Sequence, residues 1–205
     1  MKLYELLDKR RATRYFDPMR KLEREKLEEI IKHALLSPSG FNLQSWRFIA
    51  VESEKQKEKL FECAFRQDKV KEASVVLICC GDLECHKDVN KISADMVAKN
   101  YMPPEAEVGF IKMVKDYYAN PQRTHDSIFR DVMLASMVTM MAAMEAGVDS
   151  APMSGFDVAK VKEAFNLPEN ITPVLLLALG YARKSNPERG VRKKLADVLH
   201  YEEWE

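Results

Sequence analysis

Glycine is scarce in this chain, which has 7 in 205 residues. No two glycines are separated by a single residue, and none is followed by Lys and then Ser or Thr. Dinucleotide fingerprints and P-loops need such glycines, because their backbone amides must approach the phosphates closely. The sequence therefore excludes these nucleotide loops, and any phosphate-bearing ligand has to be bound by side chains.

Cysteine is also scarce, and no C-x-x-C pair occurs among Cys63, Cys79, Cys80 and Cys85. The group of Cys79, Cys80, Cys85 and His86 admits a zinc interpretation, because thiolates and imidazole are preferred zinc ligands. Adjacent residues of a strand point to opposite faces, however, so Cys79 and Cys80 could not both face one metal. We therefore expect buried, unreactive thiols and no metal site. Four cysteines in a chain of this length do not make a disulfide scaffold, which favours a reducing compartment.

Net charge and long apolar runs are both absent. Lys and Arg number 32, and so do Asp and Glu, so the formal net charge of +0 gives no overall attraction to nucleic acid or anionic membranes. The longest strongly apolar stretches, 75–80 and 174–179, are far shorter than the roughly 20 residues that a membrane helix needs. The opening residues carry Glu5 and Asp8 where a signal peptide would be apolar. We expect a cytoplasmic protein that binds neither nucleic acid nor membrane.

The chain does contain 46% hydrophobic and 31% charged residues, the composition of a helix-rich globular protein. Its length suits a single domain over residues 1–205. The segment 126–146 is rich in methionine and apolar nearly all round, so we interpret it as a buried core helix rather than as a ligand groove. From the apolar periodicity we expect helices at 22–37, 54–65, 126–146 and 158–165, strands at 46–51, 73–80 and 172–179, and two helical pieces within 83–120, broken at Pro103 and Pro104.

Basic residues gather at the two ends of the chain. If these ends meet in space, several guanidinium groups converge in the geometry that recognises a phosphate bidentately. The alternative is two separate solvated patches, which composition alone favours. No hydrolase triad can be assembled from the histidines with any support from their spacing. The residues concerned are Lys9, Arg10, Arg11 and Arg14 near the start, and Arg183, Lys184, Arg189, Arg192, Lys193 and Lys194 near the end.

Three stretches carry a stronger indication. Residues 10–17 read RRATRYFD, residues 38–48 read PSGFNLQSWRF and residues 151–157 read APMSGFD. Together with Gly180 and Tyr181 at a strand end, they resemble in order and spacing the motifs of the nitroreductase family. The resemblance covers nearly the whole chain.

The resemblance implies an α+β fold in which helices flank a mixed β-sheet. It also implies an intertwined homodimer whose C-terminal tail reaches the partner subunit, with one FMN in each of two clefts at the subunit interface. Arg10 and Arg192, with Arg189 beside them, match residues that bind the FMN phosphate. Arg11 and Ala12 belong to the same cofactor segment, although the family usually has Ser at the position of Ala12, so only a backbone contact remains there.

Further positions match residues around the flavin ring. Arg14 matches a basic residue at the flavin N1 and O2 edge, where a fixed cation favours the reduced form. Gln67 matches an amide near the pyrimidine ring. The turn at Met153, Ser154 and Gly155 matches the one whose backbone faces flavin N5; many relatives carry Glu at the position of Ser154, so the contribution expected here is the Gly155 amide.

The loop that opens with Pro38, Ser39 and Gly40 matches the segment that lines the flavin from the partner subunit. Asn42 belongs to the same loop, with the alternative that it is a turn residue satisfying its own backbone. Phe41 is the expected substrate contact. The substrate pocket in this family is shaped by the variable middle of the chain, here 83–120.

Two further positions depart from the family pattern. Ser45 replaces the proline expected before Trp46, and Asp131 replaces a polar amide often present in the central helix. We expect the first to have little effect, and the contact made by the second stays open.

The function implied by the resemblance is an FMN-dependent oxidoreductase that uses NADH or NADPH to reduce nitroaromatics or quinones. The reaction would follow a ping-pong order with hydride transfer through flavin N5, a chemistry supplied by the cofactor, so no protein nucleophile is needed. One alternative is a flavin or enone reductase on the same fold. A more distant one is a non-catalytic, anion-binding dimer that has lost FMN.

Overall fold

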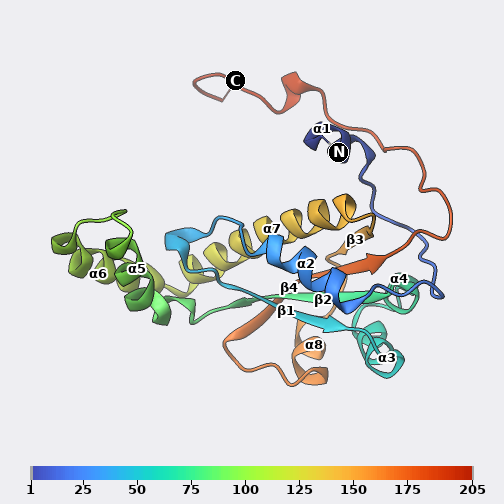
Figure 1. Ribbon diagram of the computed structural model, residues 1–205, viewed down its shortest axis with the longest axis horizontal. Coiled ribbons are helices and arrows are strands. Elements are labelled where there is room, and N and C mark those ends of the chain that lie inside the picture. The colour runs from blue at the N-terminus through green and yellow to red at the C-terminus, as the bar shows by residue number, and fades with distance from the viewer. Residues whose placement is uncertain (1, 205) are drawn as a thin grey trace.

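The computed structural model describes residues 2–204 and is built on one four-stranded sheet with the order β1-β2-β4-β3 (Figure 1). Neighbouring strands are antiparallel throughout. The parallel pairing expected of a mixed sheet is confined, in the described chain, to an isolated bridge between Ala12 and Ser150. The strands are β1 (Trp46–Val51), β2 (Val75–Asp82), β3 (Asp149–Met153) and β4 (Ile171–Gly180).

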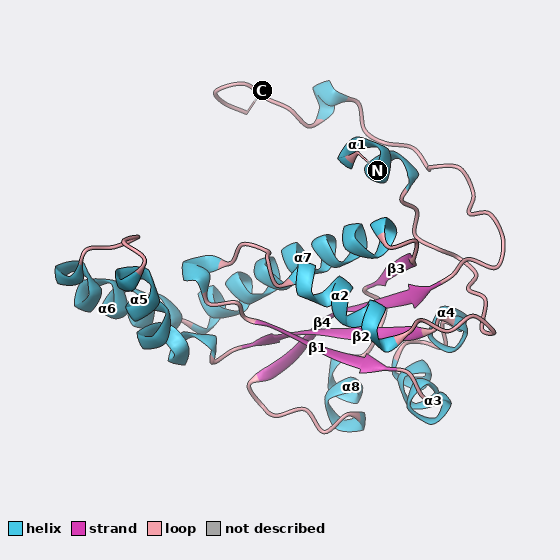
Figure 2. Ribbon diagram, viewed as in Figure 1, coloured by secondary structure: helices cyan, strands magenta, loops and turns pink. Residues whose placement is uncertain are grey.

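Helices cover both faces of this sheet, which gives the α+β class (Figure 2). On one face lie α2 (Arg24–Ala34) and α7 (Pro121–Glu145), and on the other α3 (Glu54–Cys63), α4 (Asp68–Glu72) and α8 (Val158–Ala164). α5 (Val89–Ala98) and α6 (Glu107–Tyr118) project from one end of the sheet, and α1 (Leu3–Lys9) lies beside the C-terminal segment (Figure 1). Short 3₁₀ turns are η1 (Gly40–Asn42), η2 (Cys85–Asp88), η3 (Pro104–Ala106) and η4 (Leu195–Asp197).

Strand β2 explains why the two faces form two separate cores. Every residue of β2 is buried, and successive side chains alternate between the faces. Leu77 and Cys79 pack with α2 and α7, whereas Ile78 and Cys80 pack with α3 and α8. The apolar run at 73–80 is thus confirmed as a strand buried on both sides, with Cys79 and Cys80 facing opposite ways.

All four cysteines are free and buried. Burial raises the pKa of Cys79, Cys80 and Cys85 to about 12. Among residues 2–204 there is no group of three or more His, Cys, Asp or Glu side chains placed to hold a metal ion.

Helix α7 packs tightly on β2 because residue 81 has no side chain. A Cβ added to Gly81 would lie 1.9 Å from Ile128 Cγ2. The interpretation of this segment as a core helix is confirmed for its inner side, where Ile128, Val132 and Ala135 are fully buried. Its outer side is not part of the core, because Met133, Leu134 and Met137 are 45%, 46% and 36% exposed. By length and composition α7 could also cross a membrane, but half of its apolar window is buried inside the fold, as in other core helices.

The remaining predicted elements are confirmed apart from their ends. β1 has the predicted bounds, and the segment 83–120 does form two helices separated at the prolines. Three short elements were not predicted: α1, α4 and β3. β3 contains Pro152, which its position at the edge of the sheet tolerates.

Candidate functional site

The two ends of the chain run side by side (Figure 1). Phe16 and Ala182 form an isolated antiparallel bridge, and Phe16 is fully buried. Next to the bridge the Asp17 amide donates to the Tyr181 carbonyl over 2.8 Å. These contacts bring the basic residues near the start of the chain beside those near its end.

Asn186 fastens the C-terminal segment to the N-terminal one. Its Nδ2 donates to Thr13 Oγ1 over 3.2 Å, and its Oδ1 accepts from the Arg14 amide over 3.1 Å. The fully buried Thr13 also donates its amide to the Ser150 carbonyl, which holds this segment against β3. Sequence reasoning missed Thr13 and Asn186, because two residues 173 positions apart leave no spacing pattern.

Arginines at both ends bind backbone carbonyls. Arg189 Nη2 lies 2.6 Å from the Leu7 oxygen and 3.1 Å from the Asp8 oxygen, so it satisfies carbonyls at the end of α1. Arg11 Nη1 binds the same Asp8 oxygen over 2.6 Å. Arg192 Nη1 binds carbonyls of its own segment, at residues 190 and 191. Arg189 therefore joins the two ends of the chain directly.

A small cavity of about 210 Å³ lies where the ends meet, and we call it the arginine cavity. Burial and the neighbouring guanidinium groups of Arg189, Arg192 and Arg11 lower the pKa of Arg10. No ion pair among residues 2–204 joins a carboxylate to any of these arginines. Crowded cations without a paired carboxylate favour binding of an anion. The lining residues are Arg10, Arg11, Ala12, Pro187, Glu188, Arg189, Gly190 and Arg192.

Ala12 and Arg14 flank the buried Thr13, and both are exposed. The Arg14 guanidinium carbon lies 5.5 Å from the centroid of the Tyr15 ring. Ala12 forms a backbone bridge to Ser150 and has no polar side chain to offer. A ligand at this point meets a cation from Arg14 and only backbone from Ala12.

The turn after β3 brings Gln67 and Gly155 together. Gln67 Nε2 donates to the Gly155 carbonyl over 2.7 Å and to the Ala64 carbonyl over 3.1 Å. A Cβ added to Gly155 would meet Gln67 Nε2 at 3.5 Å and Phe65 at 3.7 Å, which are ordinary contacts. Packing within the chain therefore does not require glycine here, and the missing side chain leaves room for a ligand to approach the backbone.

The neighbours of Gly155 differ in exposure. Met153 is buried at the end of β3, and Ser154 is exposed. Phe65, which sequence reasoning missed, is 68% exposed although it is aromatic. It stands beside the turn and adds a large apolar surface to it.

The loop at residues 38–45 lies beside α6, at the other end of α7 from the arginine cavity (Figure 1). Within one chain the structure therefore does not bring this loop together with Arg10, Arg189 or Arg192. Pro38 and Asn42 are exposed, and Ser39 Oγ accepts a hydrogen bond from the Gln44 amide over 2.9 Å.

Asn42 and Phe41 are presented by an unusual backbone. Their φ angles are +58° and +53°, the left-handed region that non-glycine residues seldom adopt. No hydrogen bond joins the Asn42 side chain to another residue between 2 and 204. The Phe41 ring packs edge-on against Tyr117, with 5.4 Å between ring centroids, and against Phe110 at 6.2 Å.

Asp131 and Ser45, two of the positions that depart from the family pattern, bind each other. Ser45 Oγ donates to Asp131 Oδ2 over 3.0 Å, and the Gly40 amide donates to Asp131 Oδ1 over 3.0 Å. Asp131 is only 4% exposed. Burial raises the pKa of this carboxyl, while the hydrogen bonds from Gly40 and Ser45 act in the opposite direction. The contact of Asp131 that the sequence left open is thus with the loop.

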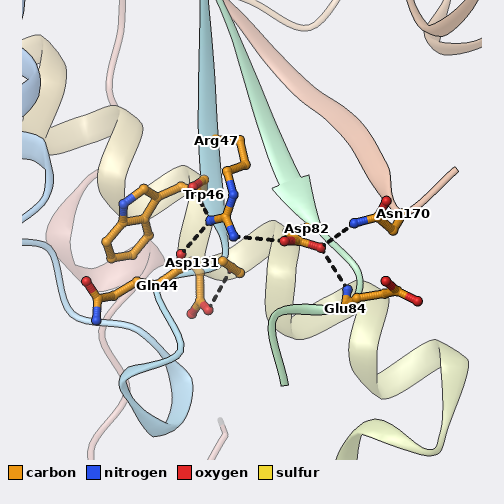
Figure 3. A network of polar contacts seen from close by, with 8 residues as sticks. Gln44, Trp46, Arg47, Asp82, Glu84, Asp131 and Asn170 are labelled. Carbon is orange, nitrogen blue, oxygen red and sulfur yellow. Dashed lines mark hydrogen bonds and ion pairs between the residues drawn. The ribbon is translucent and has the colours of Figure 1, made fainter. Parts of the chain in front are cut away.

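A second network of polar contacts binds the end of the same loop at Gln44 and is centred on Arg47 and Asp82 (Figure 3). Arg47 Nη2 lies 2.8 Å from Asp82 Oδ2, and its Nη1 donates to the Gln44 carbonyl over 3.1 Å. Asp82 Oδ1 accepts from Asn170 Nδ2 and from the Glu84 amide, over 2.8 and 2.9 Å. Asp82 thereby links the ends of β2 and β4 to Arg47, which binds the Gln44 carbonyl of the loop.

Comparison with known proteins shows the family to which the chain is similar. The model of the nitroreductase family matches residues 7–181. A Bacillus subtilis (strain 168) protein provisionally named NAD(P)H nitroreductase YdgI is 33% identical over 182 residues, which are 87% of this chain and 87% of that protein. A solved structure from Exiguobacterium sibiricum, provisionally described as a nitroreductase in complex with FMN, superposes with a TM-score of 0.87 and 30% identity, covering 98% of this chain and 97% of that one. The CLA biosynthesis enone reductase of Lactiplantibacillus plantarum is 28% identical over 187 residues, which are 88% of this chain and 85% of that protein.

Proposed function

The chain belongs to the nitroreductase family, and we propose that it is an FMN-dependent oxidoreductase that uses NADH or NADPH to reduce nitroaromatics or quinones. The observation that carries the proposal is the arginine cavity. Four arginines surround it, and burial together with like charge lowers the pKa of Arg10. An anion with several oxygens, such as the phosphate of FMN, would relieve this repulsion and accept hydrogen bonds from the guanidinium groups.

In this proposal Arg10 and Arg192 bind the phosphate, and Arg189 and Arg11 hold the backbone that shapes the cavity. Arg189 and Arg11 already bind the carbonyl oxygen of Asp8, so much of their hydrogen-bonding capacity serves α1. The chain thus supplies both charge and a fixed frame at the phosphate end.

The ring of the cofactor would lie along β3, between the arginine cavity and the turn at Gly155. Arg14 would face the N1 and O2 edge, the Gly155 amide would donate toward N5, and Gln67 would contact the pyrimidine ring. Met153 and Ser154 complete that turn, and Ala12 contributes backbone. FMN, when bound, supplies hydride chemistry at N5, and ping-pong exchange of the two substrates at one site follows from it. The chain's residues bind and orient the cofactor, and Arg14 adds the cation that favours the reduced flavin.

We propose that the site is completed in a homodimer, by the 38–45 loop of a second chain. Pro38, Ser39, Gly40 and Asn42 would line the flavin from the partner, and Phe41 would contact the substrate. Apolar surface available for such a dimer lies on α7 and on the C-terminal tail, where Leu134 is 46%, Val191 97% and Trp204 84% exposed. In this proposal a second chain buries these exposed side chains. The proposal includes a cytoplasmic location.

An enone is the second candidate acceptor, because the chain is similar to an enone reductase over most of its length. Steady-state rates on nitroaromatics, quinones and enones, measured with the same electron donor, distinguish the two. Absence of turnover on nitroaromatics and quinones, with turnover on an enone, would replace the first candidate by the second.

The decisive experiment is the visible spectrum of the purified protein, followed by release and chromatographic identification of the chromophore. We expect FMN, and bleaching of its absorbance when NADH or NADPH is added without oxygen. A colourless protein that takes up no added FMN would contradict the proposal. The dimer is tested by the hydrodynamic mass of the flavin-loaded protein, and a mass of one chain would overturn that part alone.

A further inference from the structure

We propose that Asp131 is a positioning residue that fixes the 38–45 loop, through Gly40 and Ser45, in the shape that presents Phe41 and Asn42 to the acceptor. The inference depends on the proposed function in one respect, which is that the loop faces an electron acceptor. The contacts themselves lie within one chain and are complete there.

The first argument is that Asp131 binds both ends of the loop at once. Its Oδ1 accepts from the Gly40 amide at the beginning, and its Oδ2 accepts from the Ser45 hydroxyl at the end, both over 3.0 Å. A side chain that is 4% exposed on a rigid helix gives both bonds a fixed origin. The six residues from 40 to 45 are therefore anchored to α7 at both ends.

The second argument is that the loop would not keep its shape without such anchors. Phe41, Asn42 and Gln44 have φ angles of +53°, +58° and +48°. Non-glycine residues in this region persist only where the surroundings determine them. The strained residues lie between the two anchored positions, and they include both side chains that the proposed site needs from this loop.

The third argument is the fit of Gly40 against α7. A Cβ on Gly40 would lie 3.2 Å from Ser127 Oγ, a tight contact that would require Ser127 to shift by a few tenths of an ångström. Ser127 is in turn hydrogen-bonded to the Tyr118 hydroxyl over 3.1 Å. The backbone of the loop thus sits directly on a polar layer formed by α6 and α7.

The ionisable groups around Asp131 do not supply another anion that could accept the hydrogen bonds from the loop. Arg130 on α7 is the cation that acts on it. From η2 and α6 it is faced by Cys85 and Tyr118. Burial raises the pKa of the Cys85 thiol to about 12 and raises that of Tyr118 as well, so both are neutral where the enzyme works. Asp131 is therefore the anionic acceptor that this layer offers to the loop.

The experiment compares Asp131→Ala with Asp131→Asn in the full-length protein. Asn can accept from Gly40 and donate to Ser45 Oγ, so it keeps both contacts, whereas Ala removes both. We expect amide hydrogen exchange of residues 39–46 to become at least 10-fold faster in D131A and to change less than 3-fold in D131N. Asp126→Asn, on an exposed turn of the same helix, is the matched control and should leave exchange in the loop unchanged.

Kinetics provide the second measurement. In D131A we expect the acceptor half-reaction to lose at least 10-fold in kcat/KM, with D131N restoring it to within 3-fold of the wild type. Loop exchange that is equal in D131A and wild type would overturn the inference, and so would equal kinetic losses in D131A and D131N. If the wild type binds no FMN, the proposed function fails, yet the exchange experiment still decides the role of Asp131.

Discussion

The arginine cavity and the 38–45 loop place charge in opposite ways. At the cavity, four cations crowd together with no ion-paired carboxylate among the described residues, and burial together with this like charge lowers the pKa of Arg10. At the loop, one anion is buried on α7 and each of its oxygens accepts a hydrogen bond from the loop. The contacts of the loop are complete within one chain, whereas the proposed partner of the cavity is a bound anion. The difference distinguishes the arginines, which are proposed to bind a ligand, from Asp131, which is proposed to position the loop.

Removing a cation from the arginine cavity should have the largest effect, and it should weaken ligand binding without changing the loop. For Arg10→Ala we expect the FMN dissociation constant to rise roughly 10- to 150-fold, because a hydrogen bond to a charged group contributes about 1.5–3 kcal/mol. Titration of the apoprotein with FMN, followed by flavin fluorescence, measures it. Arg24→Ala is the control, because Arg24 pairs with Glu52 on the surface of α2. Equal effects of the two substitutions would show that overall charge, rather than the cavity, attracts FMN.

A methyl group at Gly155 tests the turn that faces the proposed ring. In Gly155→Ala the free energy of unfolding should change by less than about 0.5 kcal/mol, because the added Cβ makes only ordinary contacts. The rate of flavin reduction by NADH should fall about 10-fold, since the backbone becomes less accessible. Thermal unfolding and stopped-flow absorbance measure the two effects.

Gly109→Ala serves as the comparison for this substitution, because nothing lies within 4 Å of its added Cβ. It should leave flavin reduction unchanged. A fold that unfolds readily in Gly155→Ala would mean that the glycine is required by the chain itself.

Loosening the link between the chain ends should have a smaller effect. Asn186→Ala removes the hydrogen bonds to Thr13 and to the Arg14 amide, and each such bond contributes about 0.5–1.5 kcal/mol. We expect FMN binding to weaken by about 1 kcal/mol and amide exchange of residues 12–16 to accelerate. Unchanged binding with faster exchange would show that the cavity does not depend on this link.

The smallest expected effect is a pH dependence of stability caused by Asp131. Burial raises its pKa in the folded protein, so the folded state binds the proton more tightly than the unfolded chain. Wild-type stability should therefore fall as pH rises through the interval between the unfolded and the folded pKa. Asp131→Asn lacks this dependence.

Thermal unfolding of both proteins from acid to neutral pH measures the difference. The variant should be the more stable one at neutral pH, and the gap should close on acidification. A variant less stable than the wild type by a constant amount at every pH would contradict the raised pKa.

Much of the fold could be predicted because it depends on local patterns. The alternating burial of β2 follows from an apolar run too short for a helix, and β1 begins and ends where its β-branched and aromatic residues do. β3 was missed because a five-residue strand with Pro152 carries no clear pattern. The outer face of α7 was assigned to the core because sequence alone does not show which apolar face finds a partner within the chain.

The candidate site also has parts that the sequence indicated and parts that it did not. The arginines were identifiable as two basic ends that could meet, whereas the contact between Gln67 and Gly155 is seen only in the structure. The pairing of Ser45 with Asp131 joins residues 86 positions apart, so no spacing rule indicates it. The available signal was that both residues depart from the family pattern. Because their side chains hydrogen-bond to each other, the two departures are explained together.

The buried cysteines have a consequence for the chemistry proposed here. Quinones are electrophiles that add to thiolates, and a reductase that handles them risks alkylating itself. With a pKa of about 12, only about one thiol in 10⁵ is ionised at pH 7. Cys63, the fourth, is also buried and its pKa is also raised. The fold thus keeps all four of its thiols from reacting with the quinones proposed as substrates.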